Sequence, residues 1–348
     1  MTLPLPLRST FRRLLVGGLA LVALAGPASG PAHAQSNVGT TIGQFLLIEP
    51  SAQTAAMGNV GAAAAGEVLS AYYNPAALGA LGRSDAQFTH ARWLADVQFD
   101  HAAVAVDLGR YGTVMGAATV LQSGDIDVRT VEQPLGTGEQ FDVQNLALAL
   151  GYGRRITDRF TAGAQVALVN ESIYRSSLTA FAVGFGVRYQ IGGGPVLGAS
   201  LSNLGTRARY DGLDLSIRYD ADPDAAGDNS ALPGRLTTDR YSLPTLFRVG
   251  LAWPVQVSGD SRVTLAADAF QPSDNTESVS VGGEWRWREL LSVRAGYQNL
   301  FQDELEGGLT LGAGLAYRAA GLGVRFDYAW NDFGRIGDAQ RFTLGVSF

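Results

Sequence analysis

The chain offers few side chains suited to catalysis or metal binding. Beyond its first 34 residues it contains two histidines, His90 and His101, and it has no cysteine. Cysteine nucleophiles, cysteine-bound zinc and iron–sulfur clusters are therefore excluded. Two histidines without an HExxH pattern would need borrowed carboxylates to hold a metal, and they do not support a Ser-His-Asp arrangement. We predict no catalytic residue, no metal site and no cofactor, with both histidines at a rim or in a wall.

One polar stretch carries four carboxylates, at Asp220, Asp222, Asp224 and Asp228. Carboxylate oxygens are the ligands that Ca²⁺ prefers, but the spacing lacks the glycine and terminal glutamate of an EF-hand loop. We interpret the stretch as a solvated acidic loop and leave calcium binding open.

The overall charge argues against a nucleic-acid partner. The 348 residues carry 26 basic side chains, all arginine, against 32 acidic ones, for a net charge of −6, and no basic tract stands out. A hydrophobic content of 46% with 17% charged residues is typical of a folded chain. Glycine is frequent, at 44 residues.

The first 34 residues have the order of a secretory signal peptide. Arg8, Arg12 and Arg13 precede an apolar stretch over 14–26, and Ala32-His33-Ala34 forms a small-residue cleavage site. The stretch is shorter than the roughly 18 apolar residues that a membrane anchor needs. We therefore predict an exported protein.

The rest of the chain alternates between apolar and polar residues with a period of two. In 321–331, Leu322, Val324 and Phe326 share one face, while Arg325 and Asp327 share the other. Successive strand residues point to opposite sides, so each segment is a strand with one apolar and one polar face. Segments of about 10 residues suit a tilted strand that crosses a bilayer.

Fourteen such segments follow one another, and their connections differ in length. The segments are 85–94, 97–108, 112–122, 143–153, 159–170, 178–189, 195–204, 243–253, 261–270, 276–287, 290–298, 308–318, 321–331 and 339–348. Short turns alternate with longer loops, notably 123–142, 205–242 and 299–307. This pattern predicts an all-β fold, a 14-stranded antiparallel transmembrane β-barrel over 85–348 in the bacterial outer membrane. A soluble β-sandwich also alternates, but it does not normally use so many strands of this length.

The register places several charged residues on the inward face. A barrel interior is polar by necessity, so we interpret them as a lumen network of ion pairs. They are Asp268, Glu284, Arg286, Arg294, Arg318, Arg325, Asp327 and Arg341.

Aromatic residues give two further expectations. Trp93, Trp253, Trp285, Trp287 and Trp330 should mostly lie near strand ends, because indoles prefer the membrane interface. The last strand alternates up to Phe348, and such a terminal aromatic resembles the signal that the barrel-assembly machinery reads.

The segment before the barrel is rich in small residues and does not alternate. It contains Met57-Gly58 and then Asn74-Pro75-Ala76. This preface resembles the hatch of the FadL-like outer-membrane proteins, whose Asn-Pro-Ala motif it matches, and fourteen strands agree with that family's barrel. We predict a hatch over 35–84 inside the lumen, with residues 43–82 packed near the periplasmic end, Asn74 bonded to backbone or wall groups, and Pro75 starting a second short helix.

Within this superfamily the chain resembles the PorV/PorQ group over essentially its whole mature length. The matching segments are 45–48, 90–96, 124–126, 136–139, 201–205, 272–275 and 294–297. Gln53 stands in a region where that group usually carries an arginine, which removes the ionic contact to the wall that an arginine there could make.

The resemblance implies two roles, which the sequence leaves open. Some PorV/PorQ members are components of type IX secretion that bind and shuttle secreted cargo, and we take a non-enzymatic role of this kind as the main hypothesis. The wider superfamily passes small hydrophobic molecules through a hatch-plugged barrel, which is the alternative. Expected partners are outer-membrane lipid and the barrel-assembly machinery, together with cargo and type IX components in the first role or hydrophobic solutes in the second.

Overall fold

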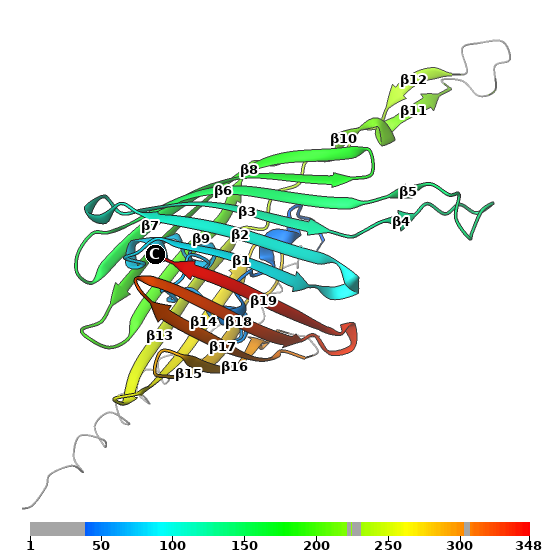
Figure 1. Ribbon diagram of the computed structural model, residues 1–348. Coiled ribbons are helices and arrows are strands. Elements are labelled where there is room, and N and C mark those ends of the chain that lie inside the picture. Colours follow the sequence, from blue (N-terminus) through cyan, green and yellow to red (C-terminus); the bar gives the residue numbers. More distant parts are fainter. Residues whose placement is uncertain (1–38, 221–223, 225–230, 303–306) are drawn as a thin grey trace, which may run out of the picture. The chain divides into compact units, whose positions relative to one another are not determined.

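Fourteen antiparallel strands form one closed barrel in the computed structural model, which describes residues 39–220, 224, 231–302 and 307–348 (Figure 1). The barrel strands are β1 (Asp85–Arg92), β2 (Gln98–Asp107), β3 (Thr113–Gln122), β6 (Val143–Arg155), β7 (Phe160–Ile173), β8 (Ser176–Gln190), β9 (Val196–Gly205), β13 (Leu246–Ser258), β14 (Ser261–Pro272), β15 (Ser278–Trp287), β16 (Leu291–Leu300), β17 (Leu309–Ala319), β18 (Leu322–Asp332) and β19 (Asp338–Ser347).

Each barrel strand pairs with its neighbours in the chain, and the last strand closes the ring on the first. β1 pairs with both β2 and β19, with Phe88 opposite Leu344 in the closing pair. β9 joins β8 to β13 across the longest connection. Closure leaves no unpaired sheet edge, as a spanning sheet requires. The predicted fold class is confirmed, and all fourteen predicted segments are strands of the barrel.

The two faces of the sheet differ in polarity as the alternation predicted. Side chains such as Phe88, Leu150 and Leu344 are exposed on the outer face, while Thr89 and Asp327 are fully buried on the inner face. An apolar outer surface on a closed barrel is stable in lipid and not in water. The barrel therefore belongs in the bacterial outer membrane. Within the described residues, no helix combines the length and apolar content needed to cross a membrane.

The connections define two rims. Short turns follow β2, β6, β8, β13, β15 and β17, and this end, where β1 starts and β19 stops, is the periplasmic rim. The long connection 123–142 and the described parts of 206–245 lie at the other end, the outer rim. They carry the small strands β4 (Ile126–Asp127), β5 (Gln140–Phe141), β10 (Asp211–Gly212), β11 (Ser216–Tyr219) and β12 (Leu232–Arg235), which extend beyond the barrel strands (Figure 1).

Several strand boundaries differ from the prediction, most of all those of β7 and β13. β7 continues to Ile173 and β8 begins at Ser176, so their outer-rim connection has two residues and the predicted alternation of short and long is not strict. The polar run through Glu171 hid the end of β7, because Glu171 faces the lumen. β13 continues through Pro254 to Ser258, paired with β14.

Four of the five tryptophans lie at or near strand ends, which confirms the prediction for most of them. Trp287 ends β15, Trp93 follows β1, and Trp285 and Trp330 lie two residues from the ends of β15 and β18. Trp253 is further inside β13.

Between residue 39 and the barrel, four short helices occur, and small helical turns lie in the barrel connections. The first group comprises η1 (Gln44–Leu47), α2 (Ala52–Ala55), α3 (Ser70–Tyr73) and η2 (Pro75–Ala80). The turns are η3 (Leu94–Asp96), η4 (Gly109–Tyr111), η5 (Leu213–Leu215) and η6 (Gly334–Ile336). The predicted signal peptide and its cleavage site lie outside the described residues, as do Asp222 and Asp228 of the acidic loop.

The outer face yields a direct test of membrane embedding. Leu150 lies near the middle of β6 with its side chain 68% exposed, so Leu150→Arg would place a charge in the hydrocarbon. We expect the free energy of unfolding in lipid vesicles to fall by roughly 2–4 kcal/mol. The control is Val131→Arg in the 123–142 loop, where the side chain is 95% exposed and should stay in water. Equal stability of the two variants would contradict the bilayer placement.

Candidate functional site

The hatch, residues 43–82, runs through the barrel lumen from one rim to the other. At the outer rim the N–H of Ile42 donates to the carbonyl of Ser242 (3.1 Å), and the N–H of Gly43 donates to the Glu171 carboxylate (2.8 Å). At the periplasmic rim Ser84 exchanges backbone hydrogen bonds with Phe348. The hatch therefore spans the full height of the lumen, and its predicted confinement to the periplasmic end is wrong.

The hatch touches opposite sides of the wall. α2 contacts β17, β18 and β19, whereas η2 contacts β3, β6, β7 and β8. Most of its residues are buried, including Ala52, Leu69 and Leu78. A segment that packs against both halves of a closed ring lies inside that ring, as the sequence predicted.

The hatch backbone lies directly against glycines of the barrel wall. A Cβ on Gly198 of β9 would lie 1.9 Å from the carbonyl oxygen of Ala62, and one on Gly282 of β15 would lie 2.1 Å from that of Met57. Real Cβ atoms do not approach backbone so closely, so these contacts require glycine. Gly163 and Gly296 meet hatch backbone in the same way, and Gly186 meets the side chain of Asn74. The high glycine content of the chain thus has a packing role.

The Asn74-Pro75-Ala76 motif fixes the start of η2 against the wall. The Asn74 Oδ1 atom accepts from the N–H of Ala76 (3.0 Å), and its Nδ2 atom donates to the carbonyls of Ala62 (2.6 Å) and Val187 (3.0 Å). Pro75 occupies the first position of η2, where its missing N–H costs nothing. Asn74 thus ties two hatch segments to β8.

The Met57-Gly58 turn packs the middle of the hatch against β15 to β17. Gly58 has φ +71°, a conformation that favours glycine, and its N–H donates to the Thr310 hydroxyl (2.9 Å). Beside it, the buried Asp268 carboxylate on β14 accepts from the N–H groups of Gly61 (2.7 Å) and Ala62 (2.8 Å). These wall groups satisfy hatch N–H groups that have no partner within a helix.

Five of the predicted lumen residues form one ion-pair network. Glu284 pairs with Arg286 (2.8 Å) and Arg294 (2.7 Å), and Asp327 pairs with Arg294 (2.6 Å) and Arg325 (2.9 Å). The network lies on β15, β16 and β18, with Glu284 and Arg294 almost fully buried. The sequence expected these residues together, and the structure brings them together.

The network reaches the hatch through a residue that the sequence analysis missed. Arg325 donates to the carboxylate of Glu67, which also accepts from the hydroxyl of Ser51 (2.5 Å). Burial raises the pKa of Glu67, and the Arg325 guanidinium opposes that rise. Arg325 also donates to Gln53 Oε1 (3.2 Å), so the hatch contributes the acid and the wall the base. An ionic contact between hatch and wall is therefore present, although residue 53 is a glutamine.

The other three predicted network members lie elsewhere. Asp268 binds hatch backbone, as described above. Arg341 is fully buried near the outer rim, where it donates to Asn331 (2.6 Å) and stacks on the Trp93 ring. Arg318 lies at the periplasmic rim, and among the described residues it makes no ion pair. All three residues face inward, but they do not belong to the ion-pair network.

A second charged group, also missed from sequence, lies below the outer rim. Glu49 of the hatch approaches Arg248 of β13 at 3.6 Å, and Arg248 stacks between the rings of Tyr73 and Phe270. Both Arg248 and Arg341 are buried, which an isolated charge would not tolerate. The only signal in the sequence was an acidic residue before Pro50 in an otherwise apolar segment.

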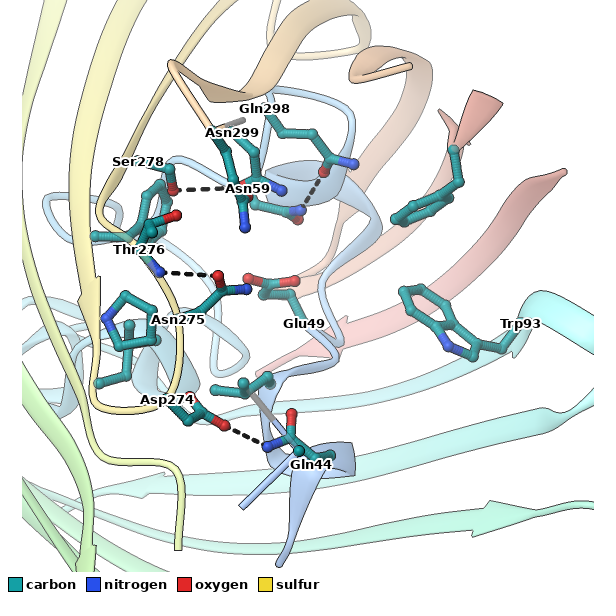
Figure 2. Close-up of a pocket in the computed structure, with 17 residues that line it drawn as sticks. Gln44, Glu49, Asn59, Trp93, Asp274, Asn275, Thr276, Ser278, Gln298 and Asn299 are labelled. Carbon is teal, nitrogen blue, oxygen red and sulfur yellow. Dashed lines mark hydrogen bonds between the residues drawn. The ribbon is translucent and has the colours of Figure 1, made fainter. Parts of the chain in front are cut away.

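Above this group is a cavity of about 260 Å³ that opens at the outer rim (Figure 2). Gln44 and Glu49 of the hatch face Asp274, Asn275 and Thr276 of the β14–β15 connection, with Trp93 on the opposite side (Figure 2). Gln44 and Thr41 both donate to Asp274. Apolar side chains complete the lining, namely Leu47, Leu246, Phe270, Pro272 and Phe333. The cavity is therefore amphipathic.

The hatch separates this cavity from two others. One of about 200 Å³ lies between the hatch and β13 to β15, and one of about 750 Å³ opens at the periplasmic rim. Those two share Arg262 and Arg286, whereas neither shares a residue with the outer cavity. The hatch is the partition between the outer and periplasmic spaces.

The histidines do not form a joint site. His101 faces the lumen and bonds to the Thr119 hydroxyl (2.8 Å), while His90 faces outward and bonds to Asp100 (2.8 Å). Among the described residues, no group of three or more histidine, aspartate or glutamate side chains is placed to hold a metal ion.

Substituting a wall glycine that contacts the hatch should displace the hatch. Gly282→Ala places a Cβ against the Met57 backbone, so we expect faster protease cleavage within the hatch of the folded barrel. The matched control is Gly116→Ala on β3, where a Cβ meets no atom within 4 Å. Unchanged cleavage of the Gly282 variant would contradict the packing of the hatch against this glycine.

The Glu67–Arg325 contact should stabilise the folded barrel. Glu67→Gln removes one of the two carboxylates that pair with Arg325 and leaves the guanidinium with Asp327 alone, so it should lower the free energy of unfolding by roughly 2 kcal/mol. Glu289→Gln is the control, because the Glu289 side chain is 59% exposed and its ion pairs should contribute about 0–1 kcal/mol. Urea titration in vesicles measures both, and equal losses would show that Glu67 has no special role.

Comparisons with known proteins agree on the fold. No family model matches the chain, and no curated protein matches it. Among solved structures, the Pseudomonas putida toluene transporter TodX has a TM-score of 0.56 at 14% identity, covering 85% of this chain and 96% of that one. A Pseudomonas aeruginosa FadL homologue has a TM-score of 0.51 at 12% identity, covering 86% and 98%.

A third similar structure is the Ralstonia pickettii toluene transporter TbuX, with a TM-score of 0.51 at 14% identity, covering 84% of this chain and 96% of that one. The barrel therefore has the FadL-like fold over nearly the full length of these transporters. Identities this low show the fold alone. The fold expected from the FadL-like resemblance is therefore confirmed, and the narrower PorV/PorQ resemblance stays a prediction.

Proposed function

We propose that the protein is a non-enzymatic channel that takes small hydrophobic molecules across the outer membrane, with the hatch as its gate. The observation that carries the proposal is the position of the hatch between an amphipathic outer cavity and the two inner cavities, which share no lining residue with it. This was the alternative hypothesis from sequence, and the geometry supports it better than cargo shuttling.

The outer cavity is suited to a small apolar solute. A dry cavity of roughly 150 Å³ holds benzene, so about 260 Å³ has room for a monoaromatic molecule with some solvent. Trp93, Phe270 and Phe333 provide ring surfaces, and Asn275 and Thr276 provide polar groups that orient a ligand. The similar structures are described as toluene transporters and a monoaromatic hydrocarbon channel, which agrees with a solute of this class.

Passage requires the hatch to move, since the outer cavity does not continue to the periplasmic one. Polar contacts tie the hatch to the wall, among them those of Asp268, Asn74 and the Glu67–Arg325 pair. Opening breaks such contacts locally and shifts buried hatch side chains such as Leu69 and Leu78. The hatch is therefore a plug that local rearrangement can open.

Cargo binding is the second candidate. The resemblance to the PorV/PorQ group supports it, and the outer-rim loops offer a surface, with Val131 and Leu135 each 95% exposed. On this reading type IX secretion components and cargo would co-purify with the protein from outer membranes, and the hatch would serve only as a seal. In either role Phe348, which pairs with Ser84 where the barrel closes, is the proposed contact for the assembly machinery.

A reversible tether tests the gate. Ala56 of the hatch and Ala329 of β18 belong to one buried cluster, and the chain has no native cysteine. We would introduce cysteine at both positions and confirm oxidation by a gel shift before measuring toluene uptake into cells that lack other hydrocarbon channels.

Oxidation should abolish the protein-dependent uptake, and a reducing agent should restore it. The two single-cysteine variants are the controls, and neither should respond to oxidant. Uptake that is the same in the oxidised and reduced states would overturn the moving gate. Absence of any protein-dependent uptake, together with co-purifying secreted proteins, would favour cargo binding.

A further inference from the structure

The cavity of about 750 Å³ at the periplasmic rim differs in character from the rest of the lumen. It is bounded by the start of β1, the ends of β17 and β19, and the β15–β16 turn, with Gly66 and Arg83 on the hatch side. Its space exists because Gly314, Gly323 and Gly345 occupy inward positions on three adjacent strands. We call this space the periplasmic chamber.

Positive charge dominates the lining of the chamber. Seven arginines line it, against the three acids Asp85, Glu289 and Asp327. Five of these arginines have carboxylate partners, namely Arg262, Arg286, Arg288, Arg294 and Arg325, which pair among Glu67, Asp260, Glu284, Glu289 and Asp327. The charges of these five acids and five arginines cancel. Of the charged residues in the lining, this leaves Arg83, Arg318 and Asp85.

Asp85 offsets only one of these two positive charges. Its Oδ2 atom already accepts from the N–H of Val68 (2.8 Å) and from Gln87 (2.8 Å). Arg83 donates to the carbonyl of Gly66 (2.6 Å), and its buried Nε has no hydrogen-bond partner among the described residues. The lining as a whole therefore carries one uncompensated positive charge, located at Arg83 and Arg318.

The two guanidiniums repel one another. Burial lowers the pKa of Arg83, the Asp85 carboxylate opposes that fall, and the nearby Arg318 and Arg325 guanidiniums add to it. A group of like charges around an open cavity is relieved when an anion binds between them. Guanidinium forks match carboxylate and phosphate oxygens in geometry, with two parallel N–H···O bonds.

We propose that the periplasmic chamber is an anion-binding site, in which Arg83 and Arg318 hold the carboxylate or phosphate group of a small molecule that enters from the periplasmic side. The site goes beyond the proposed uptake function and does not depend on it, because the chamber opens at the periplasmic rim and shares no residue with the outer cavity. Its ligand is charged, whereas the outer cavity suits a neutral solute.

The test uses two probes of similar size that differ in charge. Benzoate and benzamide have the same ring, but only benzoate is an anion at neutral pH. We would measure their binding to the folded barrel in a neutral detergent by equilibrium dialysis at low salt. Benzoate should bind at a site that benzamide does not fill, and rising ionic strength should weaken it.

Substitution assigns that site to the chamber. Arg318→Gln should weaken benzoate binding at least tenfold, and Arg318→Lys, which keeps the charge, should retain most of it. Arg318 makes no ion pair among the described residues, so its loss should not disturb the barrel. The control is Arg110→Gln, which removes a charge from the same rim outside the chamber and should leave binding unchanged.

Competition separates the two sources of the anionic group. Displacement of benzoate by inorganic phosphate would assign phosphate as a ligand, and failure to displace it would assign carboxylates alone, both in support of the site. Equal benzoate binding by wild type and Arg318→Gln would overturn the proposal, as would equal binding of benzamide at the Arg318-dependent site. Neither result bears on hatch-gated uptake, which the cysteine tether tests separately.

Discussion

The structure depends on the need to fill a closed ring of fourteen strands. Closing the sheet pairs every edge, but it encloses a lumen whose wall carries buried polar and charged groups. The hatch satisfies many of them. Asp268 and Thr310 accept hydrogen bonds from hatch N–H groups, Asn74 donates to Val187, and Arg325 finds a counter-ion in Glu67. Wall and hatch therefore complete each other, and neither has a satisfied interior alone.

This mutual dependence explains how the hatch can be both held and released. Individual polar contacts tie it to the wall, and its backbone at Met57 and Ala62 lies directly against the wall glycines Gly282 and Gly198. Release breaks these contacts and moves buried side chains such as Leu69 and Tyr73. The charge is concentrated toward β15, β16 and β18, so one side of the hatch is anchored more strongly than the other.

The architecture could be predicted from the sequence, whereas most contacts between hatch and wall could not. Alternation with period two reports a strand directly, because it depends only on which face meets lipid, and it located all fourteen strands. It failed at Glu171, where a lumenal carboxylate inside a polar run looked like the end of β7. The pairing of Glu67 with Arg325 joins residues 258 positions apart, so no local pattern could reveal it. Asn74 was predictable because its partners are close in sequence or are backbone groups.

The most direct measurement of the central claim is amide hydrogen exchange in the protein reconstituted into lipid vesicles. The N–H groups of Gly61, Ala62 and Val68 donate buried hydrogen bonds to wall or rim carboxylates. These amides should therefore exchange as slowly as those of the barrel strands. Exchange as fast as that of the exposed loop over 128–138 would show that the hatch does not fill the lumen.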